Sequence, residues 1–186
     1  MLSAFTFAAD GDILVYISDS EGAMIIRNIK KEDIRRCVEI YNYYIINSTA
    51  TFEEQPLTEA QFAERVKRIS ADYPYLVAEE DGKVVGYAYL DKYNERSAYR
   101  FTADLSIYLD NSCVSHGVGS RLLAEIEKAA KDRGIVNILS LITEENAVSV
   151  AFHGKHGFEP VGKLEKVGFK MDKWLDVLFY QKKLNK

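Results

Sequence analysis

The sequence predicts an α/β fold of the α+β kind, with strands and helices packed into one domain. Three observations predict this fold. Residues 98–109 alternate strictly between apolar and polar side chains, residues 117–133 repeat apolar side chains at helical spacing, and Asp81-Gly82 separates two β-rich runs. The chain has 186 residues, of which 47% are hydrophobic, and this is enough for one core. We therefore expect a single domain.

The domain is expected to begin near Met24, where the β-like run Met-Ile-Ile-Arg starts. Residues 24–186 would then form the domain, and residues 1–23 an extension whose purpose stays open. The short apolar run at residues 13–17 suits an added edge strand. Asp10 and Asp12 lie where a secretory signal would be uncharged, so no signal peptide is expected.

Two helices are predicted next. Residues 31–42 place Ile34, Cys37, Val38 and Tyr41 on one face at helical spacing. Thr58 followed by Gln61 has the pattern of a capping box, in which each residue bonds the other's backbone N–H at a helix start. Phe62, Val66 and Ile69 follow on one face, so a second amphipathic helix is expected from Thr58 onwards.

Three strands are predicted after the helices. Residues 73–79 and 83–90 are rich in Val and Tyr and flank Asp81-Gly82, a dipeptide that suits a tight hairpin turn, so they should pair antiparallel. In residues 98–109, the apolar positions are Phe101, Ala103, Leu105, Ile107 and Leu109, and polar groups alternate with them. We expect the apolar face in the core and the polar face in water.

The second half predicts a helix at residues 117–133, which Gly134 is placed to end, and a buried strand at residues 135–142. A helix at residues 146–156 and strands at residues 158–163 and 174–182 follow. The expected order is one strand, two helices, three strands, then helix, strand, helix and two strands.

Composition excludes several classes of protein. The net charge is −4 and no block of Lys or Arg is present, so no nucleic-acid partner is expected. No stretch approaches the roughly 18 apolar residues of a membrane-spanning helix, so no membrane partner is expected. Cys37 and Cys113 match no metal-ligand spacing and lack the density of a secreted disulfide scaffold, which favours a reducing cytoplasmic location and no metal.

Two polar segments are candidates for a functional site. Ser115-His116-Gly117-Val118-Gly119-Ser120 joins a strand to a helix, where main-chain N–H groups and the helix N-terminus suit a bound pyrophosphate; an ordinary turn is the alternative. Asn146, Ser149 and His153 share one helix face and suit the border of a cleft. In the alternative reading, Asn146 caps the helix and His153 is a surface residue.

Taken together, these segments resemble the GNAT acetyltransferases, and most closely their phosphinothricin and methionine sulfoximine acetyltransferase branch. The resemblance covers residues 24–184. The matching segments are Ile-Tyr-Asn at 40–42, Ser-Thr-Ala-Thr-Phe at 48–52, Arg-Ser-Ala-Tyr at 96–99 with Thr102, Ser-Ile-Tyr at 106–108, Gly-Val-Gly at 117–119, the helix from Asn146 to Phe158, and Gly-Phe-Lys at 168–170 with Trp174 and Asp176.

The resemblance implies a mixed, mostly antiparallel central sheet flanked by helices, with two central strands splayed apart at the cofactor site. It implies acetyl-CoA as the acetyl donor and a homodimer. The aromatic segment from Trp174 to Tyr180 would contribute to the shared surface or, in the alternative, to the core. The loop from Ser115 to Ser120 and Asn146 would bind CoA. A main-chain N–H among Ile107, Tyr108 and Leu109 would bind the oxyanion of the acetyl group. Val114 replaces a polar residue that is usual in the family, which removes one contact to CoA.

The resemblance also assigns catalytic and acceptor-binding roles. Asp104 stands where relatives commonly have a catalytic glutamate and would accept the amine proton; the alternatives are a solvent-facing carboxylate or one paired with an arginine. His153 stands where other GNAT enzymes place a tyrosine that protonates the leaving thiolate. Arg96 would hold an acceptor carboxylate or phosphinate, and a surface ion pair is the alternative. Phe52 and Glu53 would border the acceptor. Tyr99 would border it too or, in the alternative, pack in the core.

The expected activity is therefore acetyl transfer from acetyl-CoA to the amino group of a small amino-acid-like acceptor. Phosphinothricin, methionine sulfoximine and methionine sulfone are the acceptors that the resemblance suggests. One alternative is a GNAT enzyme for another amine, such as a protein N-terminus, a polyamine or an aminoglycoside. The other is a CoA-binding sensor without turnover.

Overall fold

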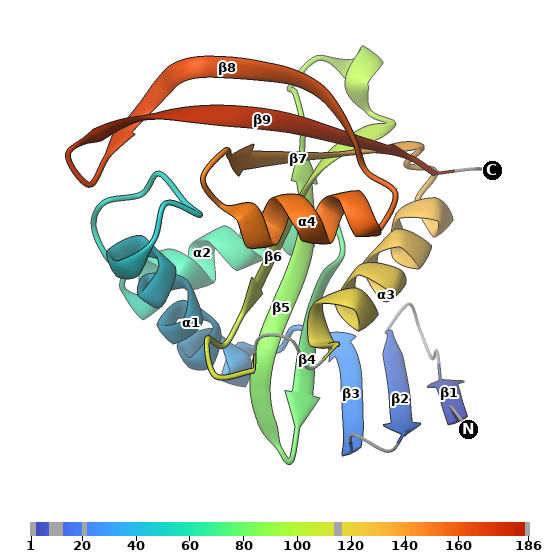
Figure 1. Ribbon diagram of the computed structural model, residues 1–186. Coiled ribbons are helices and arrows are strands. Elements are labelled where there is room, and N and C mark those ends of the chain that lie inside the picture. The colour runs from blue at the N-terminus through green and yellow to red at the C-terminus, as the bar shows by residue number, and fades with distance from the viewer. Residues whose placement is uncertain (1–2, 8–12, 20–21, 114–116, 185–186) are drawn as a thin grey trace.

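The computed structural model describes residues 3–7, 13–19, 22–113 and 117–184 (Figure 1). These residues form one nine-stranded sheet in the order β1-β2-β3-β4-β5-β6-β7-β9-β8. The strands are β1 (Ser3–Phe7), β2 (Leu14–Asp19), β3 (Gly22–Asn28), β4 (Tyr75–Glu80), β5 (Lys83–Lys92), β6 (Thr102–Leu109), β7 (Asn137–Thr143), β8 (Glu159–Lys170) and β9 (Lys173–Lys183). Neighbouring strands are antiparallel, except that β6 and β7 are parallel. The predicted mixed, mostly antiparallel sheet is confirmed.

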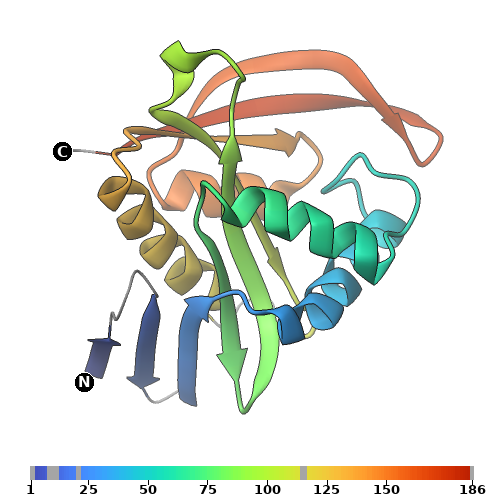
Figure 2. The same ribbon diagram turned by 180° about the vertical axis from the view of Figure 1, so that it is seen from behind.

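Helices cover both faces of the sheet. The helices α3 (Val118–Asp132) and α4 (Ala147–Lys155) lie on one face, and α1 (Ile34–Asn47) and α2 (Glu59–Ser70) lie on the other (Figures 1 and 2). The predicted capping box is present at the start of α2, where Thr58 and Gln61 bond each other's backbone. Gly134 follows α3 with a φ of 74°, the left-handed conformation that ends the helix.

Two elements run further than the sequence predicts. Helix α1 continues to Asn47, and β8 continues to Lys170, well beyond the predicted end at residue 163. The pairing of β8 with β9 shifts register between Leu164 and Gly168, and Lys166 within this shift has a φ of 50°. Such an irregularity interrupts the alternating pattern, so the sequence predicts that the strand ends there. In the structure, β8 pairs with β9 again beyond it.

The N-terminal run at residues 13–17 does form a strand, as expected, but it is not the edge strand. Strand β2 pairs with β3 on one side and with β1 on the other, so β1 occupies the sheet edge. The sequence prediction of a single added edge strand was wrong on this point, because β1 has no alternating pattern long enough to detect.

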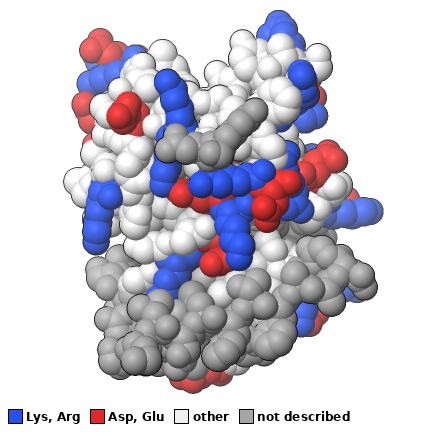
Figure 3. Space-filling view, turned by 90° about the vertical axis from the view of Figure 1, so that its right-hand side faces the viewer, with Lys and Arg blue, Asp and Glu red and all other residues white. Residues whose placement is uncertain are grey.

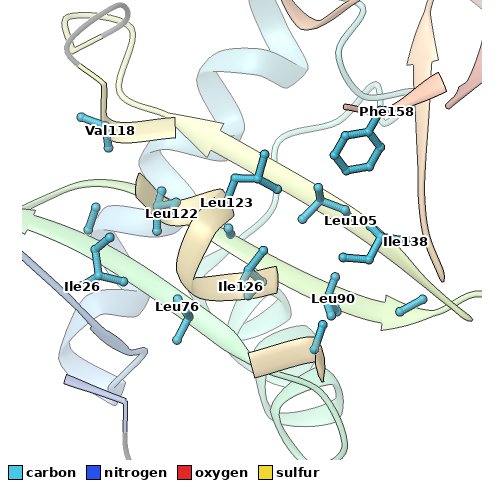
Figure 4. Close-up of a cluster of buried hydrophobic side chains, with 14 of the residues drawn as sticks. Ile26, Leu76, Leu90, Leu105, Val118, Leu122, Leu123, Ile126, Ile138 and Phe158 are labelled. Carbon is cyan, nitrogen blue, oxygen red and sulfur yellow. The ribbon is translucent and has the colours of Figure 1, made fainter. Parts of the chain in front are cut away.

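The first core cluster lies between the sheet and α3 (Figure 4). Leu122 and Ile126 of α3 pack with Leu76, Leu90 and Ile138 of the sheet, and all five side chains are fully buried. The apolar positions of β6 face the same way, since Ala103 and Leu105 belong to this cluster. The predicted apolar face of β6 is therefore confirmed.

The opposite face of β6 is not in water, as the sequence pattern had suggested. It lies against α1 and α2, where the Tyr108 ring meets the Tyr41 ring edge-on at 5.0 Å. On the neighbouring strands, Tyr75 and Tyr89 stack with their centroids 4.8 Å apart. Tyrosine carries an apolar ring and a polar hydroxyl group. Positions that the sequence pattern scores as polar can therefore pack their rings into a second core.

The parallel pairing of β6 with β7 is short. It runs from Thr102 opposite Asn137 to Asp104 opposite Leu139, and no residue beyond Asp104 in the described strand pairs with β7. Strand β6 continues to Leu109 and β7 to Thr143, so the two strands part after Asp104. This is the splayed central pair that the family resemblance implies.

Candidate active site

Backbone N–H groups of β6 point into the opening where β6 and β7 part. The N–H of Asp110 bonds the carbonyl of Val85 on β5 at 2.8 Å. Because successive residues of a strand direct their N–H groups to opposite sides, Tyr108 also faces β5, whereas Ile107 and Leu109 face the opening. Of the three predicted oxyanion donors, the geometry supports Ile107 and Leu109. The Leu109 carbonyl accepts from the Tyr44 hydroxyl at 2.7 Å.

The start of α3 offers further N–H groups. Gly117 is the N-cap residue, with a φ of 76° and no side chain to bond the helix amides. The first intrahelical bond runs from the Arg121 N–H to the Gly117 carbonyl at 3.1 Å. The N–H groups of Val118, Gly119 and Ser120 therefore have no acceptor within the helix and suit an anion. Ser115 and His116, and also Val114, lie outside the described residues.

Helix α3 begins close to both β6 and α4. A Cβ atom on Gly119 would come 3.3 Å from the Phe152 ring and 3.5 Å from Leu109 Cδ1, so the three elements meet at this glycine. Next to it, Ser120 Oγ lies 2.9 Å from Nε2 of His156, the residue that ends α4. The Ser120 hydroxyl thus bonds α4, which leaves its backbone N–H as the group available to a ligand.

Asn146 and His153 have contacts that account for them within the fold. Asn146 Oδ1 accepts from the Ser149 N–H at 3.1 Å, so Asn146 is the N-cap of α4. His153 is buried rather than at the surface, with Nδ1 2.8 Å from the Ser149 carbonyl and its ring 4.9 Å from the Phe158 ring. Burial lowers the pKa of His153, which favours a neutral imidazole. Its catalytic role stays a prediction.

Asp104 is half-buried on β6 at the last residue pair before the strands part. Its Oδ1 is buried and has no hydrogen-bond partner among the described residues. Burial, with a smaller contribution from Asp91, raises the pKa of Asp104 to about 6. Asp91 lies opposite on β5 and is the carboxylate that pairs with an arginine, because Arg68 donates to its two oxygens at 3.0 and 2.7 Å.

The loop at residues 48–53, between α1 and α2, carries Phe52 and Glu53. The Phe52 ring is 41% exposed and lies against Gly168 of β8. Glu53 forms an ion pair with Arg65 of α2, whose guanidinium lies 5.3 Å from the centroid of the Tyr41 ring. The second oxygen of Glu53, Oε2, is buried without a partner in the described part of the chain. An unpaired buried carboxylate oxygen can accept a hydrogen bond from a ligand.

Arg65 and Lys170 belong to this region, and the sequence analysis gave neither a role. Lys170 is 4% exposed and binds the 48–53 loop through its backbone carbonyls. The Gly-Phe-Lys motif pointed to Lys170 without indicating its contacts. The sequence carries no signal for Arg65, because its position on α2 is that of an ordinary polar helix residue.

Arg96 and Tyr99 lie on the connection between β5 and β6, around the short 3-10 helix η2 (Ser97–Tyr99). Both are exposed, and the Tyr99 ring packs edge-on against Tyr93 at 5.4 Å. In Figures 1 and 2 this connection lies well apart from the 48–53 loop. The fold therefore does not bring Arg96 and Tyr99 together with Phe52 and Glu53 within one chain.

A cavity of about 670 Å³ lies elsewhere, beside β3 and the start of α1. Its buried charges neutralise one another, since Arg27 pairs with Asp33 and Glu79 at 2.6 Å each. None of the predicted site residues lines it. We therefore do not assign the active site to this cavity.

On the face shown in Figure 3, Lys and Arg alternate with Asp and Glu, without a continuous basic surface. In residues 3–7, 13–19, 22–113 and 117–184, no three His, Cys, Asp or Glu side chains are grouped as metal ligands. None of the helices described is both long enough and apolar enough to cross a membrane.

Comparison with known proteins gives one family and several relatives. Residues 26–179 match the family described as acetyltransferase (GNAT) domain. The chain is 35% identical over 165 residues to phosphinothricin N-acetyltransferase of Alcaligenes faecalis, which covers 88% of this chain and 84% of the relative. It is 31% identical over 163 residues to the L-methionine sulfoximine/L-methionine sulfone acetyltransferase of Salmonella typhimurium, covering 87% of this chain and 95% of the relative.

Among solved structures, the chain resembles a GNAT superfamily phosphinothricin acetyltransferase from Sinorhizobium meliloti in complex with AcCoA. The TM-score is 0.83 at 37% identity, and the similarity covers 86% of this chain and 88% of that one. Fold and sequence similarity therefore agree over the same large part of the molecule.

Proposed function

The chain belongs to the GNAT acetyltransferase family, and from this we propose that it transfers the acetyl group of acetyl-CoA to the amino group of a small amino-acid-like acceptor. Phosphinothricin, methionine sulfoximine and methionine sulfone are the acceptor types, by analogy with the relatives. The observation that carries the proposal is Asp104, a half-buried carboxylate with an unpaired oxygen at the point where β6 and β7 part. Residues 24–186 would form the catalytic domain.

The donor would lie along the opening between β6 and β7. The uncapped N–H groups of Val118, Gly119 and Ser120 suit the pyrophosphate of CoA, because a helix N-terminus attracts anions. Ser115, His116 and Asn146 remain predictions for this cofactor site. The thioester carbonyl would meet the N–H of Ile107 or Leu109, which would stabilise the oxyanion that forms during attack.

Asp104 would remove the proton that keeps the acceptor amine unreactive. With a pKa of about 6, its carboxylate is ionised at neutral pH yet more basic than an ordinary aspartate. The freed amine attacks the thioester carbonyl, the carbon–sulfur bond breaks, and CoA leaves as a thiolate that takes up a proton. His153 is the predicted donor of that proton, whereas its burial and the bond between Nδ1 and the Ser149 carbonyl favour a neutral imidazole with a packing role.

Phe52 and Glu53 would border the acceptor. Glu53 Oε2 is suited to accept a hydrogen bond from the ammonium group of the acceptor. Arg96 stays a prediction for the acceptor carboxylate or phosphinate, and Tyr99 stays a prediction for the border of the acceptor. The connection that carries both residues lies apart from the 48–53 loop.

We further propose a homodimer in the cytoplasm. Exposed apolar side chains follow the β8–β9 hairpin and would form the shared surface. They are Val161, Leu164, Val167, Phe169, Met171 and Trp174. Val177 and Tyr180 are buried, so only the beginning of the predicted segment from Trp174 to Tyr180 supports this interface. Two free cysteines, Cys37 and Cys113, suit a reducing compartment. Light scattering should give a dimer mass at micromolar concentration.

The release of free CoA thiol tests the activity. Purified protein is incubated with acetyl-CoA and, separately, with phosphinothricin, methionine sulfoximine, methionine sulfone, a polyamine, an aminoglycoside and a short peptide with a free N-terminus. We expect thiol release with one of the first three acceptors. Release only with one of the others would replace the proposed acceptor class. Binding of acetyl-CoA without release for any amine would indicate a sensor.

A further inference from the structure

The Gly-Phe-Lys segment at residues 168–170 lies at the far end of β8, next to the 48–53 loop (Figure 1). Lys170 is almost completely buried, and its Nζ donates to the carbonyls of Ser48 and Thr51, both at 2.8 Å. These two carbonyls stand on either side of Ala50, so one ammonium group holds both ends of the turn that leads to Phe52.

Gly168 holds the same loop through the absence of a side chain. A Cβ atom there would lie 2.9 Å from Phe52 Cδ2 and closer still to two other ring carbons. The Phe52 ring therefore occupies the space that any other residue would fill. The ring is 41% exposed, so it has room to swing away.

A third contact runs through Glu145, which lies between β7 and α4. Thr49 Oγ1 lies 2.8 Å from Glu145 Oε1, and the other oxygen of Glu145 pairs with Lys173 of β9 at 2.6 Å. The hairpin thus contacts the loop through a buried ammonium, a close ring contact and a bridging carboxylate. Segments about 120 positions apart in the sequence are joined at this place.

The groups fixed by these contacts are the ones proposed to border the acceptor. Phe52 is itself in contact with Gly168, and Glu53 directly follows it. Neither Gly168 nor Lys170 touches the donor-side groups described above, which lie at the start of α3 and at the end of β6. A disturbance at the hairpin should therefore reach the acceptor and leave acetyl-CoA binding unchanged.

We propose that Gly168 and Lys170 are positioning residues for acceptor recognition, which place Phe52 and Glu53 by clamping the 48–53 loop against the β8–β9 hairpin. The proposal rests on the proposed function. Burial lowers the pKa of Lys170, because an ammonium group inside the protein loses its contact with water.

The variant Gly168→Ala tests this, with Gly162→Ala as the matched control. Both glycines lie in β8, but a Cβ atom on Gly162 meets nothing within 4 Å. We expect Gly168→Ala to lower kcat/KM for the best acceptor by about 10- to 10²-fold, because small misplacements of groups that position a substrate are costly. The KM for acetyl-CoA and the melting temperature should match those of the control.

A double-mutant cycle with Phe52→Ala identifies the cause. If the Gly168→Ala effect acts through the Phe52 ring, adding Gly168→Ala to Phe52→Ala should change kcat/KM for the acceptor less than twofold. Additive losses would overturn the proposal, as would equal losses in Gly162→Ala or a parallel rise in the KM for acetyl-CoA.

Lys170→Met provides the second arm, with Lys170→Arg as the conservative variant and exposed Lys183→Met as the control. We expect Lys170→Met to raise the KM for the acceptor and Lys170→Arg to restore part of the loss. If Lys170→Met fails to fold, the Gly168 cycle alone decides. Wild-type protein that acetylates none of the acceptors would contradict the proposed function; active wild-type protein with additive losses would contradict only the clamp.

Discussion

The two sides of the proposed active site are built from different parts of the chain. The donor side consists of backbone: the uncapped amides after Gly117 and the N–H groups of β6 that face the opening. The acceptor side consists of side chains from three distant segments, with Glu53 paired to Arg65 and Lys170 bound to the 48–53 loop. Acetyl-CoA binding through backbone N–H groups should therefore tolerate substitutions of nearby side chains. Acceptor binding, which depends on several side chains that hold one another in place, should be lost when one of their contacts is removed.

Asp104 stands between the two sides, and its replacement should have the largest effect. We expect Asp104→Asn to lower turnover at neutral pH by about 10² to 10⁴-fold, as is typical for loss of a general base. The KM for acetyl-CoA should change little, because the proposed donor site consists of backbone groups. The loss should shrink at higher pH, where more acceptor arrives already deprotonated. Wild-type turnover should fall below pH about 6, where Asp104 becomes protonated.

The stability of the same variant separates catalysis from folding. A carboxyl whose pKa is raised in the folded state costs stability once it is ionised, so Asp104→Asn should raise the melting temperature above pH about 6. This gain should fade as pH falls towards the unfolded value of 3.8, where the acid is neutral in both states. Asp91→Asn is the control, because Asp91 lies opposite Asp104 on the neighbouring strand β5. This variant should retain turnover at neutral pH. Equal turnover of wild-type protein and Asp104→Asn would remove Asp104 from the mechanism.

Gly117→Asp should have an intermediate effect, confined to the donor side. A carboxylate at the N-cap would accept from the N–H groups of α3 and would repel the pyrophosphate. We expect acetyl-CoA affinity to fall by roughly 10- to 10²-fold, which corresponds to about 1.4 kcal/mol for each factor of ten. Calorimetric titration measures this. Gly134→Asp places the same residue at the other end of α3 with an equally positive φ, and should bind acetyl-CoA normally.

Ser120→Ala should have the smallest effect and is the sharpest test of a donor site made of backbone. The change removes the hydroxyl that lies 2.9 Å from His156 Nε2 and keeps the N–H of residue 120. We expect a loss of about 0.5–1.5 kcal/mol in the free energy of unfolding, the usual value of one hydrogen bond. Affinity for acetyl-CoA should stay within about threefold, since the amide remains. A loss as large as that of Gly117→Asp would contradict the backbone interpretation.

This difference between the two sides also explains what the sequence could predict. Gly117, Gly134 and the pair Thr58 and Gln61 act on residues within one turn of themselves, so their roles follow from short patterns. The contact of Lys170 with Ser48 depends on where a hairpin ends after two register shifts, which no local pattern records.

The polar row of β6 illustrates a second limit. Alternation correctly predicted that Asp104 and Tyr108 share a face, but it could not tell water from a second layer of helices. Tyr108 packs against Tyr41 of α1, and Asp104 is half-buried on the same side of the strand. Burial of that face is also what raises the pKa of Asp104. The burial that the alternating pattern does not reveal is therefore the main cause of the raised pKa of the proposed base.

The short pairing between β6 and β7 has a consequence for how long the fold survives. Six strands on one side and three on the other share a ladder of only three residue pairs. Acetyl-CoA bound where β6 and β7 part would form hydrogen bonds with backbone groups that no neighbouring strand satisfies. The bound ligand would therefore stabilise the folded protein. A ligand at a hundred times its Kd adds about 2.7 kcal/mol to the free energy of unfolding. The supply of acetyl-CoA in the cell would then govern the lifetime of the enzyme as well as its rate.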